Sequence, residues 1–224
     1  MPALGENHHA IVTQAVGAAE QHTSGEIVTV IADRSDGYTD IAFAWSALAA
    51  FFILCLLAVF PDLVLRIVEV LNGAWNVQWW PGEIIGIASA ISITAFLLML
   101  LLQLSDVIRF ALIPGRVKTD RVENRAIDLF KVGAERRTHG RTGVLIYLSM
   151  REHRAEIVAD EAVTGKVAPE AWGEAMADML AEIRQGHVAE GLVAGIRDVG
   201  AILAEHFPRE ADDENELPDR LIEL

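Results

Sequence analysis

The chain has 224 residues, of which 52% are hydrophobic, and it carries a formal net charge of −14. Such acidity argues against nucleic-acid binding, which needs a basic face. The single cysteine, Cys55, excludes an intrachain disulfide and a cysteine-ligated metal site. We expect no cleavable signal peptide, because the N-terminal segment is polar and lacks a basic stretch followed by an apolar one.

The chain begins with a helical pattern over residues 7–22, followed by the Val/Ile-rich run "EIVTVIA" at 26–32. This run is typical of a buried strand. A strand cannot stand alone, because its backbone N–H and C=O groups need a neighbour. An acidic turn follows, and we take residues 1–40 as the first part of a soluble domain.

Residues 41–60 and 84–105 contain no charged side chain. Each is long enough to cross a hydrocarbon core of roughly 30 Å, which takes about 20 helical residues. We therefore predict a two-helix transmembrane hairpin over residues 41–108; two buried core helices are the alternative. No ionisable residue lies inside either span, which argues against a transporter or channel formed by one chain. Small residues at four-residue spacing predict the packing seam of the hairpin: Gly86 with Ala90, and Ala88 with Ser92.

The loop 61–83 joins the two spans, and residues 62–75 within it have an amphipathic pattern. They form either an interfacial helix or a loop helix packed on the hairpin. The loop belongs at the far membrane interface, because indole rings are enriched in the headgroup region and three tryptophans lie here: Trp75, Trp79 and Trp80. One helical face of the pattern carries four apolar residues: Val64, Val68, Leu71 and Trp75.

Basic residues cluster directly after the second span: Arg109, Arg116, Lys118, Arg121 and Arg125. The positive-inside rule makes this segment cytoplasmic, and an even number of spans puts both soluble parts on the same side. We therefore predict an integral protein of a bacterial inner membrane, with membrane lipids and other membrane proteins as partners. Near anionic headgroups each basic residue is worth roughly 1 kcal/mol, although fixing the topology is an alternative role. The candidate lipid contacts are Arg109, Arg116, Lys118 and Arg121.

Residues 109–208 complete the soluble domain. A helical pattern at 119–138 precedes two strands, 143–150 and 155–160, which form a hairpin. We expect the earlier strand 26–32 to pair in parallel with 143–150, through a right-handed crossover into which the membrane hairpin is inserted. Two further amphipathic helices end the domain: one from Pro169 to a C-cap at Gly186, and one over residues 188–207.

The tail, residues 209–224, is acidic and contains a late apolar clip. We expect this clip to dock on the domain or on a partner. Its residues are Leu217, Leu221, Ile222 and Leu224.

Four stretches in this order resemble the TPM domain family: "SGEIVTVIADRSDGYTD", "RAIDLFKVGAERRTHGRTGVLIYLSMREHRAEIVAD", "VAPEAWGEAMADMLAEIRQGHVAEGLVAGIRDVGAILAEHF" and "NELPDRLIEL". The resemblance covers residues 8–36 and 120–207. It implies an α/β/α sandwich with a small, Rossmann-like, mostly parallel sheet. It also implies roles in the assembly or repair of membrane complexes and, for some members, weak phosphatase activity and divalent-cation binding. The inserted hairpin and the cytoplasmic orientation depart from the commoner family layout.

Ligands of open α/β sheets favour the crevice at the carboxyl ends of the strands. Here those ends carry Asp33, Asp36 and Asp40 after the first strand, and Ser149 after the second. Three carboxylates at spacings of three and four predict a site for a hard cation, Ca²⁺ or Mg²⁺. The alternative is a solvated acidic turn that links the strand to the membrane.

Asp160 and Glu190 form a second, less favoured metal-binding pair. Asp160 ends the antiparallel strand and should therefore lie at the opposite edge of the sheet. Glu190 belongs to the first turn of the last helix, where the helix dipole alone favours a carboxylate. Signatures of nucleophilic catalysis are absent from the sequence, which has neither a Gly-x-Ser-x-Gly elbow nor a phosphate-binding glycine loop.

Together these features favour a non-catalytic, membrane-anchored accessory factor for the assembly or repair of a membrane complex. A divalent-metal-dependent phosphatase is the second hypothesis, and it rests on the carboxylates and on the family resemblance. A structural subunit of a larger membrane assembly is the third. The sequence favours a protein that is not an enzyme, while the family resemblance leaves weak phosphatase activity as an alternative.

Overall fold

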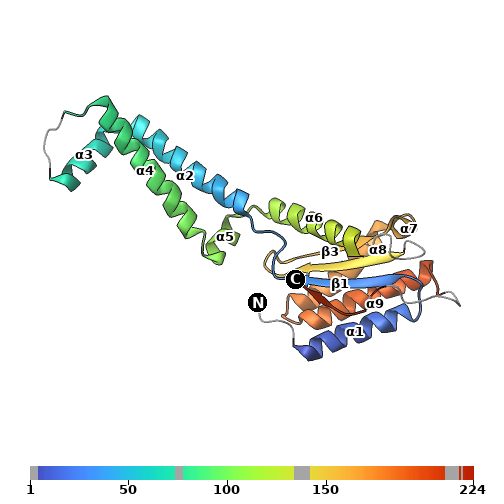
Figure 1. Ribbon diagram of the computed structural model, residues 1–224. Helices are drawn as coiled ribbons and strands as arrows, with labels where there is room; N and C mark the ends of the chain where they lie inside the picture. The colour runs from blue at the N-terminus through green and yellow to red at the C-terminus, as the bar shows by residue number, and fades with distance from the viewer. Residues whose placement is uncertain (1–4, 74–77, 134–141, 210–216, 218) are drawn as a thin grey trace. The chain divides into compact units, whose positions relative to one another are not determined.

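The computed structural model describes residues 5–73, 78–133, 142–209, 217 and 219–224 (Figure 1). The chain divides into two compact units, each treated by itself below. The first unit contains residues Met1–Asp36 and Gly115–Leu224, and the second contains Gly37–Pro114.

A four-stranded sheet with the order β3-β2-β1-β4 forms the centre of the first unit. Strand β1 (Glu26–Ala32) pairs in parallel with β2 (Gly143–Ser149) along seven residues, from Glu26 opposite Gly143 to Ala32 opposite Ser149. The predicted partner of "EIVTVIA" is thus confirmed. Strand β3 (Arg154–Ala159) returns antiparallel to β2, and the short β4 (Ile222–Glu223) adds a parallel edge to β1.

Helices cover both faces of this sheet, which confirms the predicted α/β/α sandwich (Figure 1). Alternate β1 residues point to opposite faces, as the pleat requires. Ile27 and Ile31 pack with α1 (Glu6–Glu20), α8 (Pro169–Ile183) and α9 (Val188–His206). Val28 and Val30 pack on the other face with α6 (Gly115–Gly133). The short α7 (Glu161–Thr164) connects β3 to the region before α8.

Glycine allows α9 to pack closely against its neighbours. A Cβ atom at Gly191 would lie 2.8 Å from the backbone oxygen of Met179 on α8. A Cβ atom at Gly200 would lie 2.6 Å from the Cβ of Ala19 on α1. Distances below 3 Å leave no room for a methyl group, so these positions of α9 require glycine while α1 and α8 stay in place.

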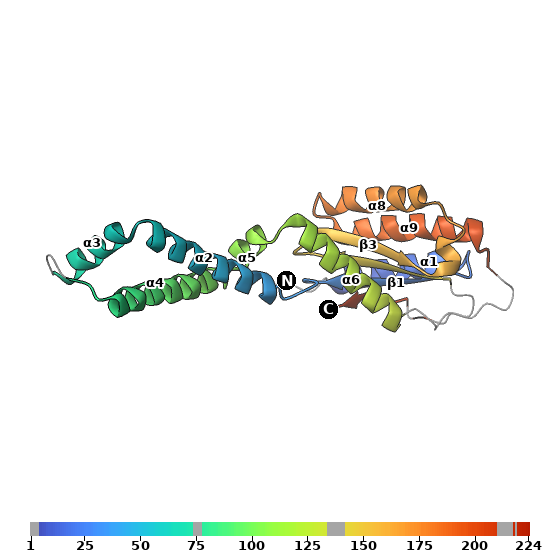
Figure 2. The same cartoon turned by 90° about the horizontal axis from the view of Figure 1, so that it is seen from above.

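The second unit is a helical hairpin formed by α2 (Thr39–Val59) and α4 (Pro81–Leu102), which pack side by side (Figures 1 and 2). Both helices are long and apolar enough to cross a membrane. The shorter α3 (Pro61–Asn72) lies at the far end of the hairpin, and α5 (Asp106–Leu112) follows α4.

The seam between α2 and α4 buries small side chains, as predicted, but only one of the two predicted pairs takes part. Ser92 is buried and Ala88 is half-buried, whereas Gly86 and Ala90 are exposed. Gly86 has no atom within 4 Å of where its Cβ would be. The Gly86–Ala90 prediction is therefore wrong. Positions two apart lie about 200° apart around a helix, so the two pairs cannot share one face.

A buried glutamine closes the other end of this hairpin. The Gln103 side chain, 1% exposed, donates hydrogen bonds to the backbone oxygens of Ala42 (3.1 Å) and Met99 (3.0 Å). Arg109 on α5 donates to the Gln103 backbone oxygen at 2.9 Å. An amide buried between apolar helices needs such partners, so these bonds fix the register of α2 against α4.

The acidic tail contributes to the first unit. Leu217 and Leu221 are buried, and the backbone N–H of Asp33 donates to the oxygen of Leu224 at 3.1 Å. The predicted apolar clip therefore docks on the domain of its own chain. It covers the β1 edge that β2 leaves open.

Candidate functional site

The carboxyl ends of β1 and β2 continue into two segments that lie side by side, residues 33–36 and the turn 150–153. Met150 and Arg151 donate backbone hydrogen bonds to the oxygens of Ala32 and Asp33, both at 3.0 Å. The pairing of the two strands is thus prolonged beyond their ends. His153 closes the turn in the left-handed region, with φ 52°.

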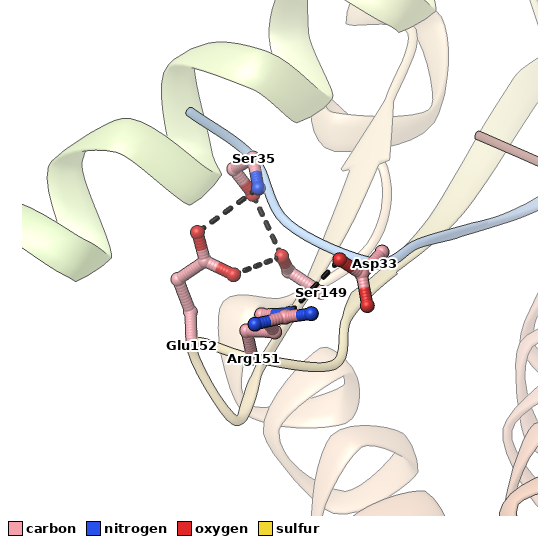
Figure 3. A network of polar contacts seen from close by, with 5 residues as sticks. All are labelled: Asp33, Ser35, Ser149, Arg151 and Glu152. Carbon is pink, nitrogen blue, oxygen red and sulfur yellow. Dashed lines mark hydrogen bonds and ion pairs between the residues drawn. The ribbon is translucent and has the colours of Figure 1, made fainter. Parts of the chain in front are cut away.

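A buried carboxylate, Glu152, joins these two segments (Figure 3). The backbone N–H of Ser35 donates to its Oε1 at 2.9 Å, and the hydroxyl of Ser149 donates to its Oε2 at 2.6 Å. Glu152 is 2% exposed and Ser149 is fully buried. Hydrogen bonds from two donors compensate the cost of burying a carboxylate at this position.

The hydroxyl groups form a directed chain that ends on this carboxylate. Ser149 donates to Glu152, and the Ser35 hydroxyl donates to Ser149 Oγ at 2.9 Å. Since the only hydroxyl proton of Ser35 is used in that bond, Tyr147 Oη is the donor in its 2.9 Å contact with Ser35 Oγ. Ser35 is half-buried, so it is more accessible to solvent than the fully buried Ser149 and Tyr147.

Burial raises the pKa of Tyr147, and the nearby negative charge of Glu152 adds to this effect. Hydrogen bonds with Ser35 and Ser149 and the charge of Arg125 act in the opposite direction. Tyr147 therefore stays a neutral hydrogen-bond donor at neutral pH. The serine that contacts the carboxylate is the buried Ser149, and the accessible Ser35 reaches the carboxylate only through Ser149.

The two aspartates of the first loop are each paired with an arginine. Arg151 Nε lies 2.9 Å from Asp33 Oδ2, as Figure 3 shows, and Arg121 Nη1 lies 3.2 Å from Asp36 Oδ2. Asp40 belongs to the first turn of α2, in the other unit. Within the described part of the chain, no group of three or more His, Cys, Asp or Glu residues is arranged to hold a metal ion. The Ca²⁺ or Mg²⁺ site at Asp33, Asp36 and Asp40 stays a prediction.

The second predicted pair lies elsewhere in the domain. Asp160 is buried and accepts a hydrogen bond from the backbone N–H of Gly143 at 3.1 Å. Gly143 begins β2, so Asp160 lies at the amino edge of the parallel strands, as expected. Glu190 is exposed in the first turn of α9, where the helix dipole favours it. Metal binding by these two residues also stays a prediction.

The four candidate lipid contacts have different surroundings. Arg109 donates to a backbone oxygen, and Arg121 pairs with Asp36. Arg116 is exposed at the start of α6, and Lys118, two residues later, is half-buried. Contact of these residues with lipid headgroups stays a prediction.

Sequence reasoning placed Asp33, Asp36 and Ser149 at this edge and missed the residues that connect it. The sequence pattern does not single out four further residues that take part: Ser35, Tyr147, Arg151 and Glu152. One signal was present, because Tyr147 and Ser149 are polar residues two apart at the end of an apolar strand and so share a face. Nothing in the polar turn sequence "REHR" (residues 151–154) reveals that Glu152 is buried.

Comparisons with known proteins agree with this architecture. The family model of the TPM domain matches residues 100–202. No curated protein matches the chain. Among solved structures, the NMR structure of the BA42 protein from the psychrophilic bacterium Bizionia argentinensis is similar, with a TM-score of 0.57 and 18% sequence identity. The similarity covers 99% of this chain and 96% of that one, and at this identity it shows the fold alone. The family model thus confirms the resemblance to the TPM domain over residues 100–202.

Proposed function

We propose that the protein is a membrane-anchored TPM domain that acts as a non-catalytic accessory factor in the assembly or repair of a membrane complex. The observation that carries the proposal is that the carboxylates at the carboxyl ends of β1 and β2 are bonded to other groups of the domain. Both oxygens of Glu152 accept hydrogen bonds from the domain itself, and Asp33 and Asp36 face arginines. Because these carboxylates are held by hydrogen bonds and ion pairs, this end of the sheet is a rigid surface suited to recognising a partner protein.

The anchor in this proposal is the hairpin of α2 and α4, whose length and composition suit a bilayer. The basic residues after the second span favour the cytoplasmic side of a bacterial inner membrane for the domain. The partner is then a membrane protein whose cytoplasmic surface lies within reach of an anchored domain.

A divalent-metal-dependent phosphatase is the second candidate, and one observation favours it. The half-buried Ser35 lies between Asp33 and Asp36 in sequence, at the strand ends where α/β sheets bind ligands, and its hydroxyl belongs to the chain that ends on Glu152. For this activity a cation would have to replace Arg151 or Arg121 as the partner of the aspartates.

A complementation experiment separates the two candidates. The native host is deprived of the protein, and the membrane complexes are quantified by native electrophoresis and mass spectrometry. We expect one complex to be lost or to assemble slowly. We expect the wild type and Asp33→Asn/Asp36→Asn to restore it equally, because asparagine keeps an oxygen that accepts a hydrogen bond from each arginine and loses only the charge that a divalent cation needs. Unchanged complexes would overturn the accessory role.

The purified full-length protein and the same double variant are then assayed on p-nitrophenyl phosphate with Mg²⁺, Ca²⁺ or Mn²⁺. Under the accessory role, any turnover is the same in both. Metal-dependent turnover that disappears in the double variant, together with failed complementation, would establish the phosphatase instead.

A further inference from the structure

Helix α3 has three separate surfaces around its axis. Its open stripe consists of four large apolar side chains, which are 60%, 50%, 68% and 80% exposed in chain order: Leu63, Ile67, Val70 and Leu71. A neighbouring surface is half-buried and carries Val64, Leu65 and Val68. At 100° per residue, the polar side chains fall on a third surface, away from the open stripe: Asp62, Arg66 and Glu69.

The start of α3 turns it away from the direction of α2. Phe60 alone separates the two helices and has the non-helical angles φ −126° and ψ 55°. Pro61 follows it and has no N–H with which to continue the α2 hydrogen bonds. α3 therefore does not prolong the span, and it ends at Gly73 in the left-handed region, with φ 67°.

The polar surface of α3 is hydrogen-bonded to the segment that precedes α4. Trp79 Nε1 donates a hydrogen bond to Glu69 Oε1 at 3.1 Å. The next residue, Trp80, is the N-cap of α4 and is 75% exposed. Both tryptophans thus lie at the level where α4 begins, and tryptophan is the residue most typical of the membrane–water interface.

In the sequence, α3 lies between two exposed apolar segments of the hairpin. Large exposed apolar residues occur at the end of α2 and at the start of α4, on either side of α3: Leu56, Val59, Phe60, Ile84 and Ile85. α3 itself carries two acidic side chains and one basic side chain, so it lacks the positive charge of helices that bind anionic headgroups.

We infer that α3 lies in the plane of the lipid leaflet, with its open stripe among the acyl chains and its polar surface toward water. The inference rests on the membrane anchorage in the proposed function. Because α3 has almost no net charge, its insertion depends on apolar burial and not on anionic lipid. The helix fixes how deep this end of the hairpin sits in the bilayer. The amphipathic pattern placed Trp75 on one face with Val64, Val68 and Leu71. In the structure Val64 and Val68 are half-buried and only Leu71 belongs to the open stripe, while Trp75 lies outside the described residues.

The test uses the full chain with Cys55→Ala, reconstituted into phosphatidylcholine vesicles. Single cysteines carry an environment-sensitive fluorophore, and lipids with nitroxide groups act as quenchers. Leu63→Cys, Ile67→Cys and Leu71→Cys probe the open stripe, and Asp62→Cys and Arg66→Cys probe the polar surface as matched controls. We expect about threefold or greater quenching at the stripe positions relative to the polar ones, as for a helix at the headgroup boundary. The same ratio is expected in vesicles with phosphatidylglycerol and at high salt.

Probes on the spans separate failure of this inference from failure of the anchorage. Leu48→Cys on α2 and Ile93→Cys on α4 replace exposed apolar residues, 54% and 60% exposed. Quenched span probes with equal, weak quenching all around α3 would overturn the inference alone. Unquenched span probes would overturn the anchorage and the inference together. Quenching of α3 that appears only with phosphatidylglycerol would overturn the apolar mode of binding.

Discussion

Carboxylates are buried at both ends of the parallel strands β1 and β2, here called the amino edge and the carboxyl edge. The hydrogen-bond donors that these carboxylates accept from differ between the two. At the amino edge, Glu20 accepts the backbone N–H of Ile27 at 2.9 Å, and Asp160 accepts that of Gly143 at 3.1 Å. At the carboxyl edge, Glu152 accepts one backbone N–H and one serine hydroxyl. A backbone donor is present whatever the sequence, whereas a hydroxyl chain needs particular side chains.

This difference shows how to weigh a buried carboxylate. Glu20 and Asp160 satisfy backbone N–H groups near the starts of β1 and β2, which is a structural role. The carboxyl-edge carboxylate is the end of a chain of side-chain hydroxyls, so its surroundings depend on Ser35, Tyr147 and Ser149 together. Burial alone therefore does not indicate function; the kind of donor distinguishes the two edges.

The largest effect is expected for Glu152→Ala, which removes the acceptor of two buried donors. We expect the free energy of unfolding to fall by about 3 kcal/mol, because charge-assisted hydrogen bonds are lost and two donors stay unpaired. The full-length protein is unfolded with urea in detergent. Its fluorescence is followed at Trp172, the only tryptophan of the first unit, after replacement of the other four by phenylalanine.

The control for this substitution is Glu174→Ala on the exposed surface of α8, which should change stability by no more than about 0.5 kcal/mol. A loss below about 1 kcal/mol for Glu152→Ala would mean that water replaces the carboxylate easily. The rigid surface in the proposed function would then lose its physical basis.

Amide substitutions at the two edges sharpen the comparison. Asp160→Ala should cost about 2 kcal/mol, and Asp160→Asn less than about 1 kcal/mol, because one neutral oxygen can still accept the N–H of Gly143. Glu152→Gln should recover little of the alanine loss, since the Ser35 N–H and the Ser149 hydroxyl bond to different oxygens of Glu152 and the amide replaces one of them with an NH2 group. The same urea titration measures all four variants. Equal recovery by Asn and Gln would show that the edges do not differ.

Much of the fold could be predicted from the sequence, because its strands are continuous apolar runs. A buried strand needs a neighbour, and "GVLIYLS" was the other run suited to a position inside the sheet. The parallel pairing then placed Asp33 and Ser149 at one edge. Leu217 and Leu221 identify the tail as a docking segment. The sequence does not predict that the tail docks on the open edge of β1.

The connections within the site could not be predicted in the same way. Glu152 belongs to a short polar turn, and such turns usually lie in solvent. Its side chain is buried because the turn continues alongside the loop after β1, through the hydrogen bond between Arg151 and Asp33 backbone groups. That contact joins residues more than a hundred positions apart, and no local pattern encodes it. The prediction of the hairpin seam was wrong for one of its two pairs for a simpler reason. Gly86–Ala90 and Ala88–Ser92 lie on different faces of α4, and only one face can pack against α2.

A third prediction concerns the middle of β1, between the two edges. Thr29 is 1% exposed, and its hydroxyl has no hydrogen-bond partner among the described residues. Thr29→Val keeps the shape of the side chain and removes an unsatisfied polar group, so stability should rise by about 1 kcal/mol. Thr29→Ser is the matched control and should not stabilise. A loss of stability in Thr29→Val would show that the hydroxyl is hydrogen-bonded in solution.

The smallest effect concerns Glu156 on β3, a carboxylate at neither edge. Burial raises its pKa from the usual 4.5, and the negative charge of Glu123 on α6 raises it further. The folded state therefore holds this proton more tightly than the unfolded state does. This contribution to stability is fully present below about pH 4.5 and is lost as the pH rises through the folded-state pKa.

Glu156→Gln removes the titration, so it should stabilise the protein by about 0.5 kcal/mol at pH 7, a modest gain because the side chain is half exposed to solvent. The gain should vanish below about pH 4.5, where Glu156 is protonated in both states. Urea titrations of both proteins from pH 4 to pH 7 provide the measurement. Glu123→Gln should give a smaller gain, since it removes the weaker of the two causes and leaves burial in place. A gain that does not depend on pH would mean that the amide side chain packs better here than the carboxyl side chain, and that the shifted pKa does not contribute to stability.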